Sequence, residues 1–362
     1  MEKTKGLFKL NQEQIREFLL NYALYIILGA IIIFVSVTTW LDPTKTPFLR
    51  VENIISIVTQ ASTKGILALG CAGLIVLAGT DLAIGRILGL CSVIVASLVQ
   101  SFTYGTRYYP QLSHLGIFQG GGWWLLPIIA LILSILVAVI ISAINGIGVA
   151  VFEMHAFIIT LGTSLICYGL SSLYVEAQPS GSSMSLSTFD QRFINIALYK
   201  VISVGPFQIP LLVVYFIICS VIVHIVWTKT RLGKNMFAVG GNMDAAAVSG
   251  VNVKKTIIGV FIMAGILYGI GSFLEAARIQ SCNSSTGTNY ELDAISACVI
   301  GGVSFTGGVG NIPGVVVGIL LLITINFILA FLGVNAYYQY IIRGLIIIIA
   351  VGIDVRKYIA RK

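Results

Sequence analysis

Charged side chains are scarce in this chain of 362 residues, in which Asp, Glu, Lys and Arg together make up only 10%. Soluble domains carry roughly 25%, so the sequence has too little polar surface to cover a soluble fold. Hydrophobic residues account for 57%, and they form recurrent apolar runs longer than about 18 residues. Because these runs are continuous rather than alternating, they predict helices that span a membrane. The expected fold class is an all-α integral membrane protein.

The sequence also lacks the patterns that mark metal sites, disulfide frameworks and nucleotide-binding loops. Its six cysteines form no CxxC pair, and most lie within apolar runs, which is typical of small buried hydrophobic side chains. Its three histidines are isolated from one another. No phosphate-binding loop of the form GxxxxGKS/T occurs. We therefore expect no metal, no cofactor and no catalytic residue in this chain.

The N-terminus lacks the pattern of a cleaved signal peptide, because its first residues have mixed charge and no small-residue cleavage site follows the first apolar run. The formal net charge of +8 does not indicate nucleic-acid binding. The basic residues lie at helix ends and in loops, where they orient a membrane protein.

We predict ten spans, the eighth of which is short and glycine-rich and therefore expected to be a broken or partial helix. They lie at about 19–40, 56–79, 84–101, 125–151, 157–177, 210–228, 257–276, 293–305, 313–333 and 336–353. The spans form a single transmembrane domain over 19–353, between an N-terminal segment of residues 1–18 and a basic tail of residues 354–362. Ten spans place both termini on the same side.

The distribution of basic residues predicts which side that is. Most of the 22 Lys and Arg residues fall in segments that are cytoplasmic if the termini are cytoplasmic. The positive-inside rule therefore predicts cytoplasmic termini. The polar loop 229–256 carries five basic residues and one acidic residue, and it is predicted to be cytoplasmic as well.

A short helix is predicted at the centre of this loop. Asn242 suits the N-cap position, Asp244 would lie in the first turn, and Gly250 stands where a left-handed residue ends a helix. The body would run from Ala245 to Val248. A helix of roughly seven residues is marginal in water on its own. It is therefore either an ordinary loop helix or an element that lies against a partner.

Two stretches combine glycine with polar residues at membrane depth. Asp81 and Arg86 flank a break between the second and third spans. An ionisable side chain at this depth either faces a cavity or a partner, or Asp81 caps the third span and Arg86 pairs locally at the cytoplasmic boundary. The dense glycines of residues 301–310 permit close helix approach or a re-entrant turn. We take as candidates for a pathway or a structural gate Asp81, Arg86, Ser304 and Thr306.

A third polar stretch contains Glu291 and Asp293, just before the eighth span. No nucleophile, metal ligand or oxyanion site lies nearby in the sequence, so helix capping at the outer mouth is the better interpretation. The interiors of the spans otherwise carry almost no charge, and Arg343 is the main exception.

The pattern Asp244-Ala-Ala-x-x-x-Gly250 resembles the EAA loop of bacterial ABC importer permeases. The resemblance extends through TDLAIGR, GKNMFAVGGNMDAAAVSGVNV, YELDAISACVIGGVSFTGGVG and NAYYQYIIRG. Together, from about Val51 to Asp354, these stretches resemble the ribose/galactose-type permeases, and most of all the galactose/methyl-galactoside branch. Asp244 stands where the general motif has Glu, which keeps the charge but shortens its reach.

The resemblance implies a multi-pass subunit of an ATP-driven sugar importer in the bacterial inner membrane. Two copies would form the pathway within the lipid, a cytoplasmic ABC ATPase would hydrolyse ATP, and an external sugar-binding protein would deliver galactose or a methyl galactoside. In this family a coupling helix fits a cleft in the ATPase. The residues implied in coupling are Gly240, Gly241, Asn242, Asp244, Ala245, Ala246 and Gly250.

Two other classes of protein remain as alternatives. An ion-coupled secondary transporter of a small polar solute needs intramembrane carboxylates or broken helices near the midplane. The nearly charge-free spans weaken a proton relay, although sodium can use backbone oxygens. A membrane enzyme needs a polar cluster at one depth, and the sequence indicates none.

Overall fold

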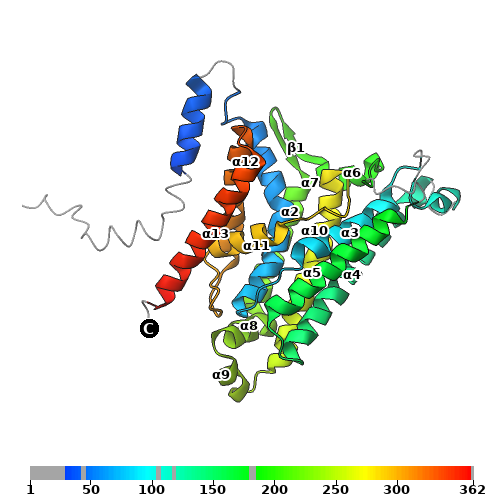
Figure 1. The fold of residues 1–362 in the computed structure, drawn as a ribbon. Helices are drawn as coiled ribbons and strands as arrows, with labels where there is room; N and C mark the ends of the chain where they lie inside the picture. The colour runs from blue at the N-terminus through cyan, green and yellow to red at the C-terminus, as the bar shows by residue number, and fades with distance from the viewer. Residues whose placement is uncertain (1–28, 42–45, 103–106, 116–119, 179–184, 360–362) are drawn as a thin grey trace, which may run out of the picture.

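The structure, a computed structural model, describes residues 29–41, 46–102, 107–115, 120–178 and 185–359. Within them most residues lie in helices (Figure 1), which confirms the expected all-α membrane fold. The predicted N-terminal segment 1–18 lies outside the described residues. Among the described helices six are long and apolar enough to cross a membrane, namely α2 (Val51–Val76), α4 (Leu125–Ala150), α5 (Ala156–Glu176), α7 (Leu211–Lys229), α10 (Val253–Ile279) and α12 (Ile312–Phe331).

The helices α2 and α10 form the centre of the bundle, and α10 packs against α4 through a GxxxG pattern. A Cβ atom at Gly269 would lie 2.5 Å from the Cα of Ile135, and one at Gly265 would lie 2.9 Å from the carbonyl oxygen of Ala138. The absence of side chains at these glycines lets the two backbones approach closely, as at other small-residue helix interfaces in membranes. The Ser134 hydroxyl also donates a hydrogen bond to the carbonyl oxygen of Gly269 at 2.7 Å.

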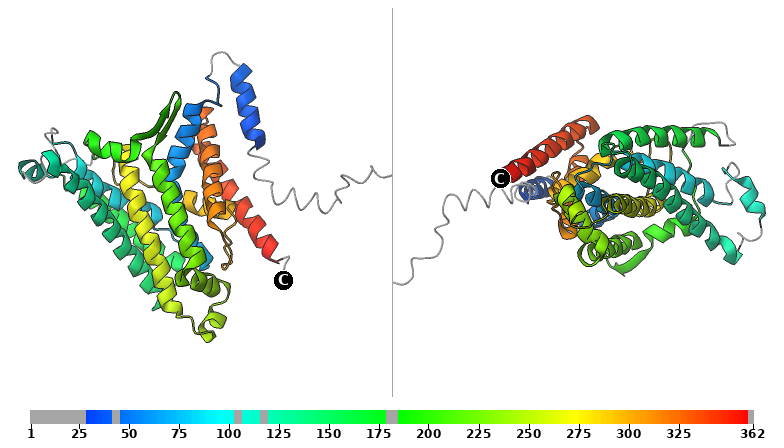
Figure 2. Two further views of the ribbon diagram at one scale, coloured as in Figure 1. Left: turned by 180° about the vertical axis from the view of Figure 1, so that it is seen from behind. Right: turned by 90° about the horizontal axis from the view of Figure 1, so that it is seen from below.

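Four further helices lie near these six but do not meet the same length and composition. They are the helix Gly29–Leu41, α3 (Ile84–Val99), α11 (Tyr290–Ile300) and the long but more polar α13 (Ala336–Ile359). The 11 residues of α11 rise about 1.5 Å each, so the helix covers only about half of a hydrocarbon core that is about 30 Å thick. Figures 1 and 2 show α11 about halfway between the two ends of the molecule.

The predicted eighth span, 293–305, therefore differs from the observed helix. Its first turns belong to α11, whereas residues from 301 to 310 are not helical. The chain leaves α11 through Gly302, which has a φ of +82° that few other residues adopt without strain. A helix lies at or near each of the ten predicted spans, but the number of spans stays a prediction.

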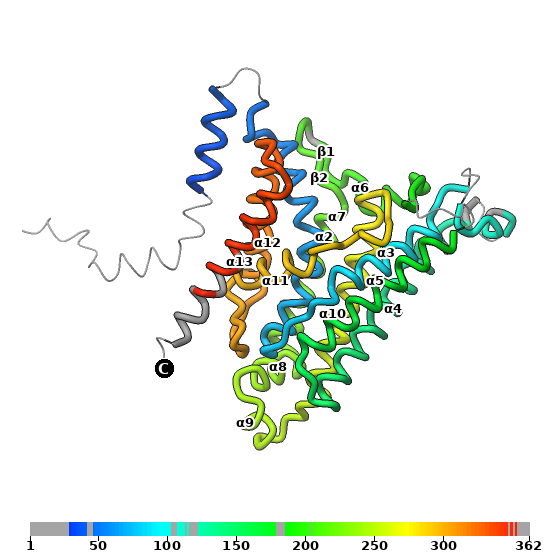
Figure 3. Tube along the Cα trace, in the orientation of Figure 1, coloured from blue at the N-terminus to red at the C-terminus, as the bar shows by residue number. Residues whose placement is uncertain are grey.

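The two ends of the molecule carry different elements. At one end α8 (Arg231–Gly241) and α9 (Met243–Val248) extend beyond the bundle (Figures 1 and 3). At the opposite end lie α6 (Gln191–Leu198) and an antiparallel hairpin of β1 (Lys200–Val204) and β2 (Phe207–Pro210). Two short 3-10 helices, η1 (Pro110–His114) and η3 (Gly120–Trp124), precede α4. The hairpin was not predicted from the sequence.

The helix α8 was not predicted, although its buried residues Gly233, Met236 and Val239 recur at helical spacing. Thr230 caps its start by accepting a hydrogen bond from the Gly233 amide at 3.3 Å. Phe237 packs edge-on against Trp227 of α7, with ring centroids 5.4 Å apart, and Met236 is buried. These contacts fix α8 to the end of α7, so that α9 is presented from a supported base.

The close approach of α4 and α10 predicts that a larger residue at the contact lowers thermal stability. In Gly269→Ala the new methyl group must displace the backbone of α4, and overpacking of this kind costs roughly 1–3 kcal/mol. Thermal unfolding of the purified protein in detergent, followed by tryptophan fluorescence, should show a lower midpoint. Gly162→Ala in α5 is the matched control, because a Cβ atom there meets nothing within 4 Å. Equal midpoints for the two variants would contradict the tight interface.

Candidate functional site

Among the described residues, α9 forms an exposed tip with a defined cap at each end. The Asn242 side chain accepts a hydrogen bond from the Ala245 amide at 2.9 Å, and Asp244 lies in the first turn. At the other end Gly250 has a φ of +84°, and its amide bonds to the carbonyl oxygen of Ala247 at 3.0 Å. The predicted N-cap and left-handed glycine are therefore confirmed, with a body of six residues.

Almost none of α9 packs against the rest of the described chain. Only Ala246 is buried, whereas Met243 and Val248 are 48% and 90% exposed. A helix of six residues gains little stability from its own hydrogen bonds. Here the two caps and the attachment to α8 hold it, and its apolar residues remain free to contact another molecule.

The base of this tip meets the bundle at a contact between backbones, which we call the glycine junction (Val76, Gly240, Gly241, Gly307 and Gly308). The Gly308 amide donates to the carbonyl oxygen of Val76 at 2.8 Å. A Cβ atom at Gly240 would overlap that same carbonyl group, and one at Gly307 would overlap the carbonyl oxygen of Gly240. The end of α2, the end of α8 and the loop after α11 therefore touch without intervening side chains.

The four candidate gate residues do not form one site. Asp81 is fully buried and its Oδ1 accepts a hydrogen bond from the Ala83 amide at 2.8 Å. The N-cap residue of α3 is Ala83 and no side chain caps this helix, so the predicted capping by Asp81 is wrong. The local pairing predicted for Arg86 is wrong. Its Nη1 donates to the carbonyl oxygen of Ser284 at 3.3 Å, and its guanidinium lies 4.5 Å from the centre of the Tyr168 ring. Both partners are distant in the sequence and come close only in the fold.

The other two candidates, Ser304 and Thr306, hydrogen-bond to each other through their hydroxyl groups at 2.9 Å in the loop after α11. This loop belongs to the end of the molecule that carries α8, as Figure 3 shows. A role of Ser304, Thr306, Asp81 or Arg86 in a pathway stays a prediction.

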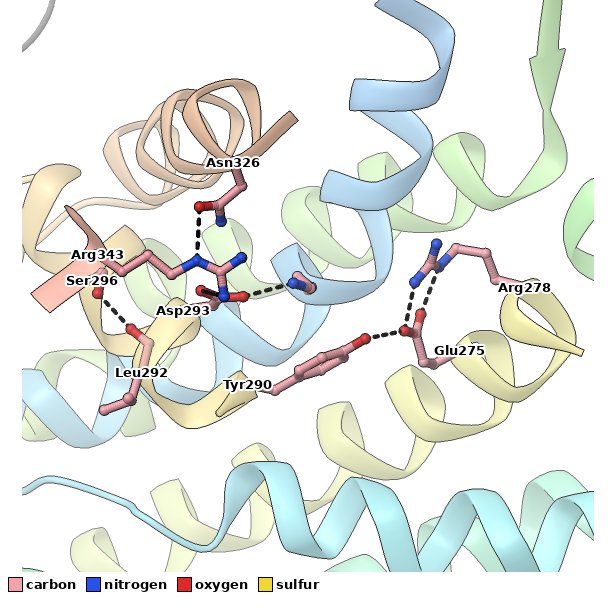
Figure 4. A network of polar contacts seen from close by, with 9 residues as sticks. Glu275, Arg278, Tyr290, Leu292, Asp293, Ser296, Asn326 and Arg343 are labelled. Atoms are coloured by element: carbon pink, nitrogen blue, oxygen red, sulfur yellow. Dashed lines mark hydrogen bonds and ion pairs between the residues drawn. The ribbon is translucent and has the colours of Figure 1, made fainter. Parts of the chain in front are cut away.

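A network of charged side chains that the sequence did not reveal lies around α11 (Figure 4). Asp293, 3% exposed, accepts a hydrogen bond from Lys64 of α2 at 2.6 Å. Its other oxygen lies 3.7 Å from an Nη1 atom of Arg343 on α13. The Nε of Arg343 donates to Asn326 of α12 at 2.9 Å. One carboxylate on α11 thus engages cations from two other helices.

A second part of the network joins α11 to α10. The Arg278 guanidinium binds the buried Glu275 carboxylate through two hydrogen bonds of 2.7 Å each. The Tyr290 hydroxyl donates to the same carboxylate at 2.6 Å, and the Lys64 ammonium lies 4.5 Å from the centre of the Tyr290 ring. Tyr290 therefore connects the two groups of charges. Bidentate pairs of this kind are the strongest charge-assisted hydrogen bonds in proteins.

This network corrects two interpretations of the sequence. Asp293 is not simply a helix cap at an outer mouth, since it pairs with Lys64 and Arg343 near the middle of the molecule. The second interpretation, that the interiors of the spans carry almost no charge, is also corrected. Charged side chains of several helices form a polar cluster at one depth. The pairs were invisible in the sequence because Lys64 and Asp293 are 229 positions apart. The sequence does contain one indication of these pairs, because an ionisable residue within an apolar helix needs a partner.

All six cysteines are free and buried, and within the described ranges no group of three or more His, Cys, Asp or Glu side chains is arranged to hold a metal ion. Outside the spans, Asp190 at the start of α6 pairs with Arg192 at 2.8 Å. Burial alone would raise the pKa of Asp190, but the hydrogen bonds and charge of Arg192 outweigh burial and lower it.

Comparisons with known proteins identify relatives along nearly the whole chain. A family model described as the branched-chain amino acid transport system / permease component matches residues 53–351. The galactose/methyl galactoside import permease protein of Haemophilus influenzae is 42% identical, over 100% of this chain and 99% of that protein. The protein of the same name in Escherichia coli K12 is 41% identical over 98% and 99%.

More distant relatives include the ribose import permease protein of Escherichia coli K12, which is 31% identical over 91% of this chain and 92% of that protein. No solved structure matches the chain.

The glycine junction predicts that alanine substitutions at two adjacent glycines affect thermal stability differently. Gly240→Ala should lower the thermal stability by roughly 1–3 kcal/mol, because its methyl group would overlap the Val76 carbonyl group and the backbone must move. Gly241→Ala should leave the midpoint near that of the unaltered protein, since a Cβ atom there meets nothing within 4 Å. Differential scanning fluorimetry of the two variants in detergent would measure the difference. Similar midpoints would show that the junction is loosely packed.

The buried pair of Glu275 and Arg278 predicts a large loss of stability when one member is removed. Arg278→Gln leaves the fully buried Glu275 charge without its cation, and such a change costs roughly 3–5 kcal/mol. Arg192→Gln breaks a pair of the same bidentate form at the surface, where Arg192 is 45% exposed, and should cost about 0–1 kcal/mol. Unfolding midpoints of the two variants test the contrast. A loss for Arg278→Gln no larger than for Arg192→Gln would refute it.

Proposed function

Because the chain belongs to the family of branched-chain amino acid transport system permease components, we propose that it is the membrane subunit of an ATP-driven importer for galactose or methyl galactosides. The observation that carries this proposal is the 42% identity to the galactose/methyl galactoside import permease of H. influenzae, which extends over 100% of this chain. The chain itself acts as a transport subunit, and ATP is hydrolysed by a separate ABC ATPase.

The ATPase docks on α9 in this proposal. The helix is exposed, ends in a 90% exposed Val248, and carries Asp244 in its first turn. An exposed apolar residue on a short, doubly capped helix is suited to insertion into a cleft of another protein. The glycine junction then supplies the route inward, since it places the base of α9 directly against α2 and the loop after α11. This assigns coupling to residues Gly240, Gly241, Asn242, Asp244, Ala245, Ala246 and Gly250.

The proposed orientation follows from this docking. The end of the molecule with α8 and α9 faces the cytoplasm, where exposed Lys229, Arg231, Lys234, Lys254 and Lys255 satisfy the positive-inside rule. The helix α13 runs toward that same end (Figure 1), which supports a cytoplasmic C-terminus. The opposite end, with α6 and the β1–β2 hairpin, faces the outside of the inner membrane and receives the sugar-binding protein. Two copies of the chain enclose the pathway within the lipid.

Reconstitution tests this function against the ion-coupled alternative. Proteoliposomes that contain the chain, its ATPase and the sugar-binding protein should accumulate labelled galactose only when ATP is present. Proteoliposomes with the chain alone should take up no sugar under a sodium or proton gradient. Gradient-driven uptake by the chain alone would establish a secondary transporter instead.

The docking role of α9 predicts a selective loss of coupling. Gly250→Pro cannot keep a φ of +84° and removes the amide that bonds to Ala247, so the end of α9 must rearrange. Deletion of residues 245–248 removes the body of the helix. Both variants should insert into the membrane, fail to retain the ATPase in a pull-down, and lose ATP-driven uptake.

Asp244→Ala should have a milder effect on the same assay, since a charge in the first turn of an exposed helix contributes only about 0.3–1 kcal/mol. Retention of the ATPase by the deletion variant at the level of the unaltered chain would count against docking on α9.

A further inference from the structure

We propose that a cavity between α11, α12 and α13 is a contact site for one sugar ring on the transport pathway. The cavity has a volume of about 140 Å³ and is lined on its polar side by Asn289, Asp293, Ser296, Tyr340 and Arg343. This inference rests on the proposed import function and assigns a place to the substrate within it. It gives the buried network a role beyond holding the helices together.

Arg343 and Asp293 are close enough for one hydroxyl group beside them to bind both. Their closest atoms, Nη1 and Oδ1, are 3.7 Å apart, which is too far for a hydrogen bond. Asn326 fixes the guanidinium through its Nε, and in the part of the chain that the structure describes neither Nη atom of Arg343 makes a hydrogen bond. A sugar hydroxyl can accept from Arg343 and donate to Asp293 at the same time, because a hydroxyl has both capacities.

Two further polar side chains on the cavity wall can form additional hydrogen bonds. Asn289 begins α11 with a left-handed φ of +65°, but its carboxamide does not cap the helix and makes no hydrogen bond among the described residues. The Ser296 hydroxyl donates to the carbonyl oxygen of Leu292 at 2.5 Å, which leaves its oxygen free to accept. Together with Arg343 and Asp293 these groups offer both donors and acceptors, as a polyol requires.

The rest of the wall suits the carbon skeleton of a sugar. Leu292, Leu322 and Gly344 provide apolar surface, and the Tyr340 ring provides an aromatic face. Small-molecule sites commonly combine apolar walls with a few placed polar groups. The cavity is smaller than the roughly 300–1,000 Å³ of drug-sized sites. Its size leaves no room for an oligosaccharide.

The depth of the cavity argues against lipid as its occupant. The half-length helix α11 lies about midway between the two ends of the molecule (Figure 1), and Asp293 and Arg343 face each other beside it (Figure 4). Hydrocarbon chains cannot satisfy a guanidinium or a carboxamide, so polar groups at this depth face water or a polar ligand. A monosaccharide is the polar ligand that the proposed function brings to this depth.

Accessibility of an introduced thiol tests whether the cavity belongs to an aqueous pathway. Gly344→Cys places a thiol on the cavity wall where a Cβ atom meets nothing within 4 Å. Ile132→Cys, at a 59% exposed apolar position on α4, is the lipid-facing control. In the reconstituted complex, a membrane-impermeant methanethiosulfonate reagent should label the cavity thiol faster than the control thiol, and millimolar galactose should slow that labelling. Equal rates at both positions, or no effect of galactose, would overturn the proposal.

Uptake kinetics test the side chains directly. Asn289→Ala and Ser296→Ala should each slow ATP-driven galactose uptake by about two- to tenfold, the expected effect of losing one neutral hydrogen bond. Ser220→Ala in α7 is the matched control for Ser296→Ala, because both hydroxyls bond only to a carbonyl oxygen of their own helix. Uptake by both test variants at the rate of Ser220→Ala would refute the site. Absence of ATP-driven uptake by the unaltered complex would instead refute the proposed function.

Discussion

A charge inside an apolar bundle must have a partner, and this constraint organises the middle of the molecule. Ionised groups are costly in a low-dielectric interior unless hydrogen bonds and opposite charges compensate them. Glu275 and Asp293 meet this requirement with Arg278 and Lys64, at 2.7 and 2.6 Å. Tyr290 joins the two pairs through its hydroxyl group and its ring. The result is one connected network across α2, α10 and α11, extended by Arg343 to α13.

The half-length helix α11 depends on this network. An 11-residue helix cannot cross the membrane, and both of its ends leave backbone groups that need partners at membrane depth. The side chains of its first turn bind three neighbouring helices, and its last turn closes through the Gly302 and Val303 amides onto Val299 and Cys298. A helix held in this way is positioned by its surroundings, so movement of those surroundings also moves α11.

The sequence predicted the parts of the fold that depend on local information. Continuous apolar runs located the long helices, and Asn242 and Gly250 located the caps of α9, because each signal lies within a few residues of the element that it defines. The same sequence did not predict α8, whose stability comes from the packing of Met236 and Phe237 against its neighbours. It also missed the pairing of Lys64 with Asp293, since a contact across 229 positions has no local signature.

The glycine junction bears most directly on the proposed coupling, and the sequence predicted it only in part. The glycines of residues 301–310 indicated a close approach of helices or a re-entrant turn, but not which elements meet there. Gly240, Gly307 and Gly308 are ordinary loop or helix-end glycines in the sequence, and only the fold brings them against the Val76 carbonyl group. Flexible side chains between two elements can absorb a displacement by changing rotamer, whereas backbones in direct contact cannot. A shift of α9 therefore reaches the end of α2 and the loop that follows α11. The helix α2 carries a partner of Asp293, and the loop continues from the helix to which Asp293 belongs. The tip and the proposed sugar contact are therefore joined through two backbones.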